Sequence, residues 1–82
     1  MTRAAILEKV NSIFQENFDD DSIVVTEETT AKDVEDWDSL EHINLIVAME
    51  KAFGINFKMG ETLSMKNVGE MLDIIQARTK IE

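Results

Sequence analysis

The residues best suited to chemistry in this sequence are Asp38, Ser39 and His42, which fall within one helical turn. An acid, a hydroxyl and an imidazole are the parts of an activated nucleophile, and side chains three residues apart can meet on a helix. However, no GxSxG turn surrounds Ser39, and 82 residues leave little room for an oxyanion hole and a substrate pocket. A small hydrolase is therefore the weakest alternative, and Ser39 taken alone is an ordinary serine at a helix start.

Several other kinds of site are excluded by composition. The chain has no cysteine, so it has no disulfide, no thiolate metal site and no thiol of its own. His42 is the only histidine, which excludes a multi-histidine metal site. An EF-hand loop starting at Asp19 would place Val24 where glycine is required and Thr30 where glutamate is required. There is also no GxxxxGK[ST] or GxGxxG motif for binding phosphates.

The charge of the chain points to a class of partner. Seventeen acidic residues against eight basic ones give a net charge of −9. Such a surface repels nucleic acid and anionic membranes, which we exclude as partners, and it attracts proteins with basic patches. The alternative is that the acidity only keeps a small protein in solution.

Length and hydropathy predict one small domain spanning residues 1–82. The chain is 44% hydrophobic, too much for a disordered segment, and it has no apolar run of about 18 residues that would span a membrane. Residues 1–9 lack the apolar core of a signal peptide. We therefore expect a cytoplasmic monomer.

Two amphipathic helices are expected near the ends of the chain. The first covers residues 3–17, with Thr2 as its N-cap. Its expected buried face consists of Ile6, Val10, Ile13, Phe14 and Asn17, with Leu7 beside them. The last covers residues 68–80, with Asn67 as N-cap, Glu70 at the third position, and Arg78 and Lys80 near its negative end. Its expected inward residues are Val68, Met71, Leu72, Ile74, Ile75 and Ala77.

The helix that begins at Ser39 has the clearest signals. Asp38 is a good N-cap, and Glu41 three residues later completes a capping-box pattern. The helix is expected to end at Phe53, because Gly54 suits the left-handed position and Ile55 suits the apolar contact of a Schellman ending. Its apolar stripe consists of Leu45, Ile46, Met49 and Phe53.

The remaining segments connect these helices. Residues 18–38 form a long, irregular, acidic segment, and a short helical turn is expected over residues 60–63. Four apolar residues are expected to tie the long segment to the core: Ile23, Val24, Val34 and Trp37. No convincing strand is present. The predicted fold is therefore all-α, a four-helix bundle of three main helices and one short one, with a long loop between helices one and two.

The segment 36–55 has the triplet Asp38-Ser39-Leu40 at its centre. This triplet resembles the DSL triplet of the acyl and peptidyl carrier protein family. The triplet opens a helix that continues Leu-Ile-x-x-Met-Glu-x-x-Phe-Gly-Ile, as such carriers often do. With the preceding amphipathic helix, the acidic loop and the apolar last helix, the resemblance covers essentially the whole chain.

The resemblance implies a prosthetic group on Ser39. In the family, a separate phosphopantetheinyl transferase moves 4′-phosphopantetheine from coenzyme A onto the serine hydroxyl. The unpaired N–H groups and the positive end of the helix suit a phosphodiester there. The arm brings the thiol that the sequence lacks, and acyl groups are held on it as thioesters. The carrier itself is then not an enzyme and presents its cargo to acyl-transferring, ligating or condensing enzymes.

The resemblance also implies a partner surface around Ser39. Its apolar part consists of Leu40, Ile43 and Val47, and the alternative is that these residues belong to the core. Its acidic part consists of Asp36, Asp38, Glu41 and Glu50, and the alternative is that they are solvated or capping charges. Trp37, directly before the triplet, is expected to anchor the loop by packing.

Departures from the family pattern affect the choice of pathway. Asn44 and Lys51 stand where carriers of the main fatty-acid pathway commonly have acids. The Trp-Asp-Ser-Leu and Phe-Gly-Ile runs are similar to stand-alone carriers of specialised pathways, including polyketide-like, lipopolysaccharide-related and aminoacyl systems. Two alternatives stay open: an aminoacyl or peptidyl carrier on the same scaffold, and an acidic interaction module without a prosthetic group.

The crowding of acids predicts a salt-dependent stability. Residues 19–41 are rich in acids, with Lys32 the only base among them. Their mutual repulsion opposes the folded state and is screened by salt. We expect the melting temperature, measured by circular dichroism, to rise between about 10 mM and about 200 mM salt. An unchanged melting temperature over this range would show that the repulsion is unimportant.

Overall fold

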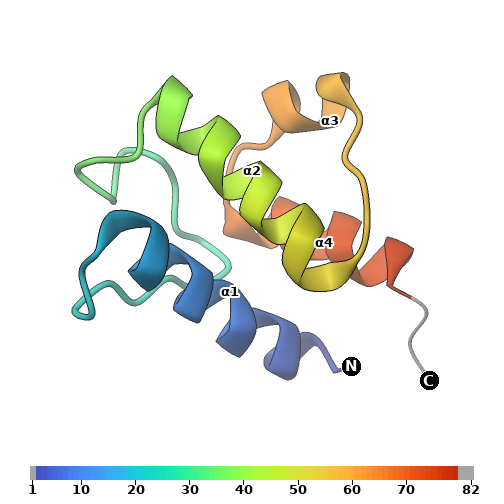
Figure 1. Ribbon diagram of the computed structural model, residues 1–82, viewed down its shortest axis with the longest axis horizontal. Helices are drawn as coiled ribbons and strands as arrows, with labels where there is room; N and C mark the ends of the chain where they lie inside the picture. Colours follow the sequence, from blue (N-terminus) through green and yellow to red (C-terminus); the bar gives the residue numbers. More distant parts are fainter. Residues whose placement is uncertain (1, 80–82) are drawn as a thin grey trace.

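Four helices make up the computed structural model, which describes residues 2–79 (Figure 1). They are α1 (Arg3–Phe18), α2 (Ser39–Phe53), α3 (Met59–Ser64) and α4 (Val68–Arg78). No strand occurs in the described part of the chain, which confirms the all-α expectation. In Figure 1, α1 lies below α2 and α4, and the short α3 lies at the opposite side of the bundle. None of the described helices is both long and apolar enough to cross a membrane.

The core is built from one face of each long helix and a few loop residues. Its members are Ile6, Val10, Ile13, Phe14, Val25, Val34, Trp37, Leu45, Ile46, Met49, Ile55, Val68, Met71, Leu72 and Ile75. The expected face of α1 is confirmed except for Asn17, and that of α4 except for Ile74 and Ala77. Ala77 is exposed because it lies two residues beyond Ile75, which is about 200° around a helix.

Both ends of α2 are fixed by local hydrogen bonds. The Asp38 carboxylate accepts from the Glu41 N–H at 2.9 Å, so the N-cap is confirmed. The capping box is only half formed, because the Asp38 N–H donates to the Asp36 carbonyl at 3.1 Å. At the other end, Gly54 has a φ of 66°, and the N–H groups of residues 54 and 55 both donate to the Glu50 carbonyl, at 2.9 and 3.2 Å. This is the expected left-handed ending.

The other helix boundaries differ slightly from expectation. α1 extends one residue further, to Phe18, and ends on Asp19 in the left-handed conformation, with a φ of 52°. α3 is longer than the expected turn by one residue at each end. α4 ends at Arg78 because the backbone of Thr79 is extended, and Lys80, the expected last residue, lies outside the described residues.

The long α1–α2 loop is held to α1 by side-chain amides. Asn11 accepts from the Val25 N–H at 2.7 Å and donates to the Val25 carbonyl at 3.1 Å. Gln15 donates to the Ile23 carbonyl at 2.8 Å. Because neighbouring side chains of an extended chain point in opposite directions, the inward Val25 leaves Val24 exposed. The expectation that Val24 ties the loop to the core was therefore wrong, and Val25 does so instead.

The same loop also lies directly against the first turn of α4. The N–H groups of Val68 and Gly69, which have no partner within their own helix, donate to the carbonyls of Thr29 and Glu27 at 2.9 and 2.8 Å. A Cβ atom on residue 69 would lie 2.9 Å from the Glu27 carbonyl oxygen, closer than real Cβ contacts come. The backbones can therefore approach this closely only because residue 69 is glycine.

Arg3 of α1 also contacts this junction between the loop and α4. Its guanidinium donates twice to the Glu27 carboxylate, at 2.8 and 2.9 Å, and once to the Gly69 carbonyl at 3.1 Å. It also pairs with Asp73 of α4 at 2.8 Å. These hydrogen bonds lower the pKa of Glu27 and raise that of Arg3. One side chain thus joins α1, the loop and α4.

The close approach at Gly69 predicts opposite effects for two glycine-to-alanine substitutions. Gly69→Ala should lower the free energy of unfolding by about 1–3 kcal/mol, because the loop must move away from α4. Gly60→Ala, in α3, has nothing within 4 Å of its new Cβ and should raise it by up to about 1 kcal/mol through helix propensity alone. Chemical denaturation followed by circular dichroism measures both. Equal effects of the two substitutions would contradict the role given to Gly69.

Candidate functional site

Ser39 is the first residue of α2 and its side chain is exposed. The chain reaches it through two tight turns, in which the Trp37 N–H donates to the Val34 carbonyl at 3.0 Å and the Asp38 N–H to that of Asp36 at 3.1 Å. The side chain and carbonyl of Asp38 take the N–H groups of the third and fourth helical residues. The N–H groups of Ser39 and Leu40 have no acceptor within a helix at this position. The serine hydroxyl therefore lies beside the positive end of α2.

Trp37 fixes the position of this helix start. Its ring is buried and meets the Phe14 ring of α1 edge-on, with centroids 5.1 Å apart and planes at 82°. Its indole N–H donates to Nδ1 of His42 at 3.1 Å. The expectation that Trp37 is a packing anchor is confirmed.

His42 is tied on both sides of its ring. Nδ1 accepts from the indole N–H of Trp37, so the proton of the neutral ring lies on Nε2, which donates to the Thr62 carbonyl of α3 at 2.9 Å. Neither nitrogen is free to accept a proton from Ser39. This arrangement argues against the hydrolase alternative, and it gives His42 a structural role that sequence spacing alone did not indicate.

The three apolar residues next to Ser39 lie outside the core. Leu40, Ile43 and Val47 are 66%, 56% and 43% exposed. The alternative that they are core residues was therefore wrong, and they form an exposed apolar strip along α2. Leu63 of α3, 80% exposed, lines the same hollow as Ile43 and widens this surface. The sequence did not predict Leu63 as part of this surface, because a six-residue helix is too short to show hydrophobic periodicity.

The four acids predicted around the serine have different surroundings. Asp36 and Asp38 are exposed. Glu41 is half-buried and accepts from the side-chain amide of Asn17 in α1 at 3.0 Å. Glu50 accepts from the Phe57 N–H at 2.8 Å and thereby holds the segment that leads to α3. Asp36 thus only faces solvent, whereas Asp38 as the N-cap, Glu41 and Glu50 also support the fold.

A hollow of about 400 Å³ opens beside Ser39. It lies between α2, α3 and the start of α4, and the fully buried Met71 forms part of its wall. Trp37 and His42 line it as well, so the residues that fix Ser39 also shape this space. An exposed hydroxyl at the edge of a partly apolar hollow can hold a covalent group whose far end enters the hollow.

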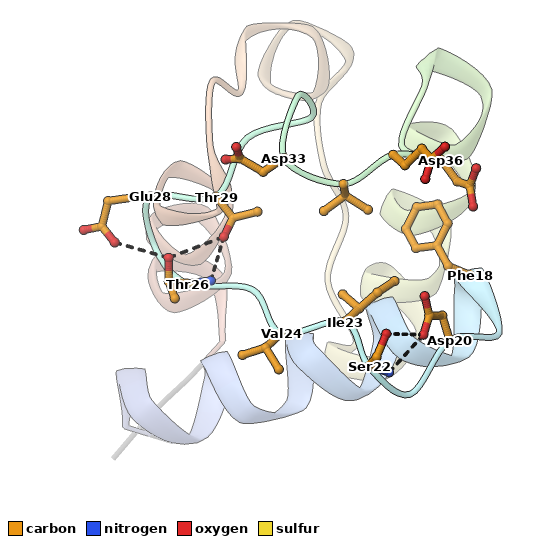
Figure 2. Close-up of a pocket in the computed structure, with 12 residues that line it drawn as sticks. Phe18, Asp20, Ser22, Ile23, Val24, Thr26, Glu28, Thr29, Asp33 and Asp36 are labelled. Carbon is orange, nitrogen blue, oxygen red and sulfur yellow. Dashed lines mark hydrogen bonds between the residues drawn. The ribbon is translucent and has the colours of Figure 1, made fainter.

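A second hollow, of about 460 Å³, lies inside the α1–α2 loop (Figure 2). Its polar groups bond mainly to one another: Asp20 accepts from Ser22, the Thr26 N–H donates to the Thr29 hydroxyl, and the Thr26 hydroxyl donates to Glu28. The bonds from Ser22 lower the pKa of Asp20. Ser39 does not line this hollow, and no group of three or more metal-binding side chains occurs in the described residues. The hollow beside Ser39 is therefore the candidate site.

Comparison with known proteins gives a consistent result. No protein-family model matches the chain. It is 35% identical over 77 residues to acyl carrier protein 2 of Ralstonia nicotianae, covering 94% of this chain and 95% of the relative. It is 37% identical over 76 residues to the acyl carrier protein of Thermosynechococcus vestitus, covering 92% and 93%. The solution structure of the holo acyl carrier protein from Geobacter metallireducens matches 88% of this chain and 83% of that one, with a TM-score of 0.82 and 47% identity.

The exposure of the α2 strip predicts that two leucines five residues apart differ in their contribution to stability. Leu45 is fully buried, so Leu45→Ala should cost about 2–5 kcal/mol of unfolding free energy. Leu40→Ala should change it by less than about 0.5 kcal/mol, because the side chain is mostly in solvent. Urea denaturation of the two variants checks this. A large loss for Leu40→Ala would place that residue in the core.

Proposed function

The chain belongs to the acyl carrier protein family, and we propose that it carries acyl intermediates as thioesters on a 4′-phosphopantetheine group attached to Ser39. The observation that carries the proposal is the exposed hydroxyl of Ser39, in the DSL triplet at the start of α2, beside a hollow of about 400 Å³. The Geobacter metallireducens relative is a holo protein, which supports a prosthetic group here as well.

The residues around Ser39 fit a phosphodiester. The hydroxyl is accessible to a transferase, and the free N–H groups and positive end of α2 favour a phosphate attached there. The Asp38 carboxylate is occupied as the N-cap, where it accepts from the Glu41 N–H. When bound, the pantetheine arm supplies the thiol that forms the thioester, since the chain has no cysteine. The protein's own part is to hold and present the arm, while the transfer chemistry belongs to its partner enzymes.

The partner surface that we propose has an apolar centre and an acidic surround. Leu40, Ile43 and Val47 form the centre, and Asp36 and Asp38 provide the exposed acids next to the serine. An exposed apolar strip with few charges is typical of the centre of a protein interface, whereas rim charges mainly raise association rates. This surface fits a phosphopantetheinyl transferase and acyl-transferring, ligating or condensing enzymes with basic patches.

We further propose that the whole chain, residues 1–82, acts as one carrier domain of a specialised pathway. Asn44 and Lys51 are both exposed on α2, where an additional acid would strengthen attraction to a basic groove. Each exposed charge pair contributes about 0.2–1 kcal/mol, so one attraction lost and one repulsion gained weaken a transient complex several-fold. A general fatty-acid enzyme is therefore expected to use this carrier less well than its own.

Attachment to Ser39 is tested by intact-mass spectrometry after reaction with coenzyme A and a broad-range phosphopantetheinyl transferase. We expect the protein to gain the mass of one phosphopantetheine group, and Ser39→Ala to gain nothing. Ser12→Ala, which removes an exposed serine of α1, should be modified like the unaltered protein.

Two results would contradict the assignment. One is modification that persists in Ser39→Ala, and the other is no mass gain with any transferase. If the mass gain is observed, the same reaction is repeated with Leu40→Ala. This variant should remain folded but be modified more slowly, because an apolar residue near the centre of an interface contributes strongly to binding.

A further inference from the structure

The hollow beside Ser39 is bordered by a lysine as well as by the serine. Ser39 borders it from α2, and Lys66 borders it from the short segment between α3 and α4. Among the described residues that line this hollow, Lys66 is the only lysine or arginine. Any group attached to the serine therefore meets a space of about 400 Å³ with one basic side chain at its edge.

The backbone of Lys66 is held against the first turn of α4. Its N–H donates to the Glu70 carboxylate at 2.9 Å, and the Glu70 N–H in turn donates to the side chain of Asn67 at 2.9 Å. Two residues after Lys66, the Val68 N–H donates to the Thr29 carbonyl at 2.9 Å. The exposed side chain of Lys66 thus extends from a fixed point of the chain.

The carboxylates around the hollow are bonded to other groups. Asp38, which also lines the hollow, is the N-cap of α2. Glu61 of α3 pairs with Arg78, whose hydrogen bonds are the main cause that lowers the pKa of Glu61 to about 2. Glu70 accepts from the backbone of Lys66. In the described part of the chain, no carboxylate forms an ion pair with the Lys66 ammonium, which leaves it available to a new anion.

The group that we propose for Ser39 supplies such an anion. A phosphodiester carries one negative charge at neutral pH, and its phosphate is bonded directly to the serine oxygen. Asp38 repels this charge, whereas the unpaired N–H groups at the start of α2 attract it. A lysine ammonium is a compact charge on a flexible stem and is well suited to phosphate. Lys66 therefore offers a second attraction, from outside α2.

We propose that Lys66 is a positioning residue for this phosphodiester: its ammonium pairs with the phosphate on Ser39 and directs the prosthetic arm over the hollow. The inference rests on the proposed attachment at Ser39 and adds a residue from another element that holds the phosphate. An exposed ion pair favours the paired arrangement by about 1.4- to fivefold. Lys66 thus biases the direction of the arm and still allows the arm to leave.

The pairing is tested by comparing lysine reactivity in the apo and holo proteins, after intact mass has shown complete modification of the holo sample. Both are treated briefly with an acetylating reagent at low ionic strength, and each acetylated lysine is quantified by peptide mass spectrometry. We expect Lys66 to react about 1.4- to fivefold more slowly in the holo protein, because an amine held in an ion pair is less available. Lys51 is the internal control, since it is also exposed and lies about 18 Å along α2 from Ser39.

Repeating the reaction at about 500 mM salt separates ion pairing from simple shielding by the arm. Salt screens the attraction between the two charges but leaves the bulk of the arm unchanged. The difference between the apo and holo rates of Lys66 should therefore shrink at high salt. The rate of Lys51 should be the same in both proteins at either salt concentration.

Phosphorus NMR of the holo protein follows the same pair from the phosphate. The phosphodiester resonance should shift between about 10 mM and about 500 mM salt, as screening weakens the pair. In Lys66→Gln the resonance should lie near its high-salt position throughout. Lys66→Arg keeps the charge and should restore the salt-dependent shift. Lys51→Gln, the matched control for loss of one positive charge, should behave like the unaltered protein.

The proposal is overturned if Lys66 is acetylated equally fast in the apo and holo proteins, or if its protection is undiminished at high salt. It is also overturned if Lys66→Gln retains the phosphorus resonance and salt dependence of the unaltered protein. These failures differ from failure of the proposed function, which would appear earlier as the absence of a mass gain and would overturn both proposals.

Discussion

The geometry around Ser39 depends on the burial of Trp37, two residues earlier in the chain. The indole packs against Phe14 of α1 and hydrogen-bonds to His42 of α2, so it fixes the end of a long loop against two helices at once. Asp38 can then cap α2 only in one place, and the serine follows at the first helical position. Loss of the indole would remove the loop's main apolar anchor next to the site and leave the imidazole without its donor.

The loop itself is stabilised by specific polar contacts as well as by apolar burial. In a 20-residue connection with few large apolar groups, the backbone must find acceptors and donors outside regular structure. Side-chain amides of Asn11 and Gln15 supply them from α1, and the unpaired N–H groups at the start of α4 supply them from the other side. The contacts between the loop and α4 are possible because Gly69 has no side chain. Arg3 bonds to both the loop and α4, and its positive charge pairs with two of the acids. An acidic loop can therefore be ordered without a large share of the core.

Sequence patterns predicted the features that depend on neighbouring residues. The limits of α2, its N-cap and its left-handed ending were confirmed because each requires only residues within one turn, and most of the core followed from helical periodicity. The prediction that the Val24 side chain points into the core was wrong, because the direction of this side chain is set by Asn11, thirteen residues away. The second role of Glu41 was missed because it depends on Asn17 of another helix. The structural role of His42 was missed, since its partner on α3 lies twenty residues further along and shares no motif with it.

The two sides of the candidate site are held by different kinds of interaction. The start of α2 is fixed by a buried indole, a capped first turn and a core-facing stripe, so these contacts set the position of Ser39. The opposite wall, α3, has no buried side chain and is attached through Glu61 and the carbonyl of Thr62. In the carrier function that we propose, a fixed start of α2 would offer the attachment point to partner enzymes in a constant place. The attachment of α3 is linked to the position of the serine, because His42 bonds both to the Thr62 carbonyl of α3 and to Trp37, which fixes the start of α2.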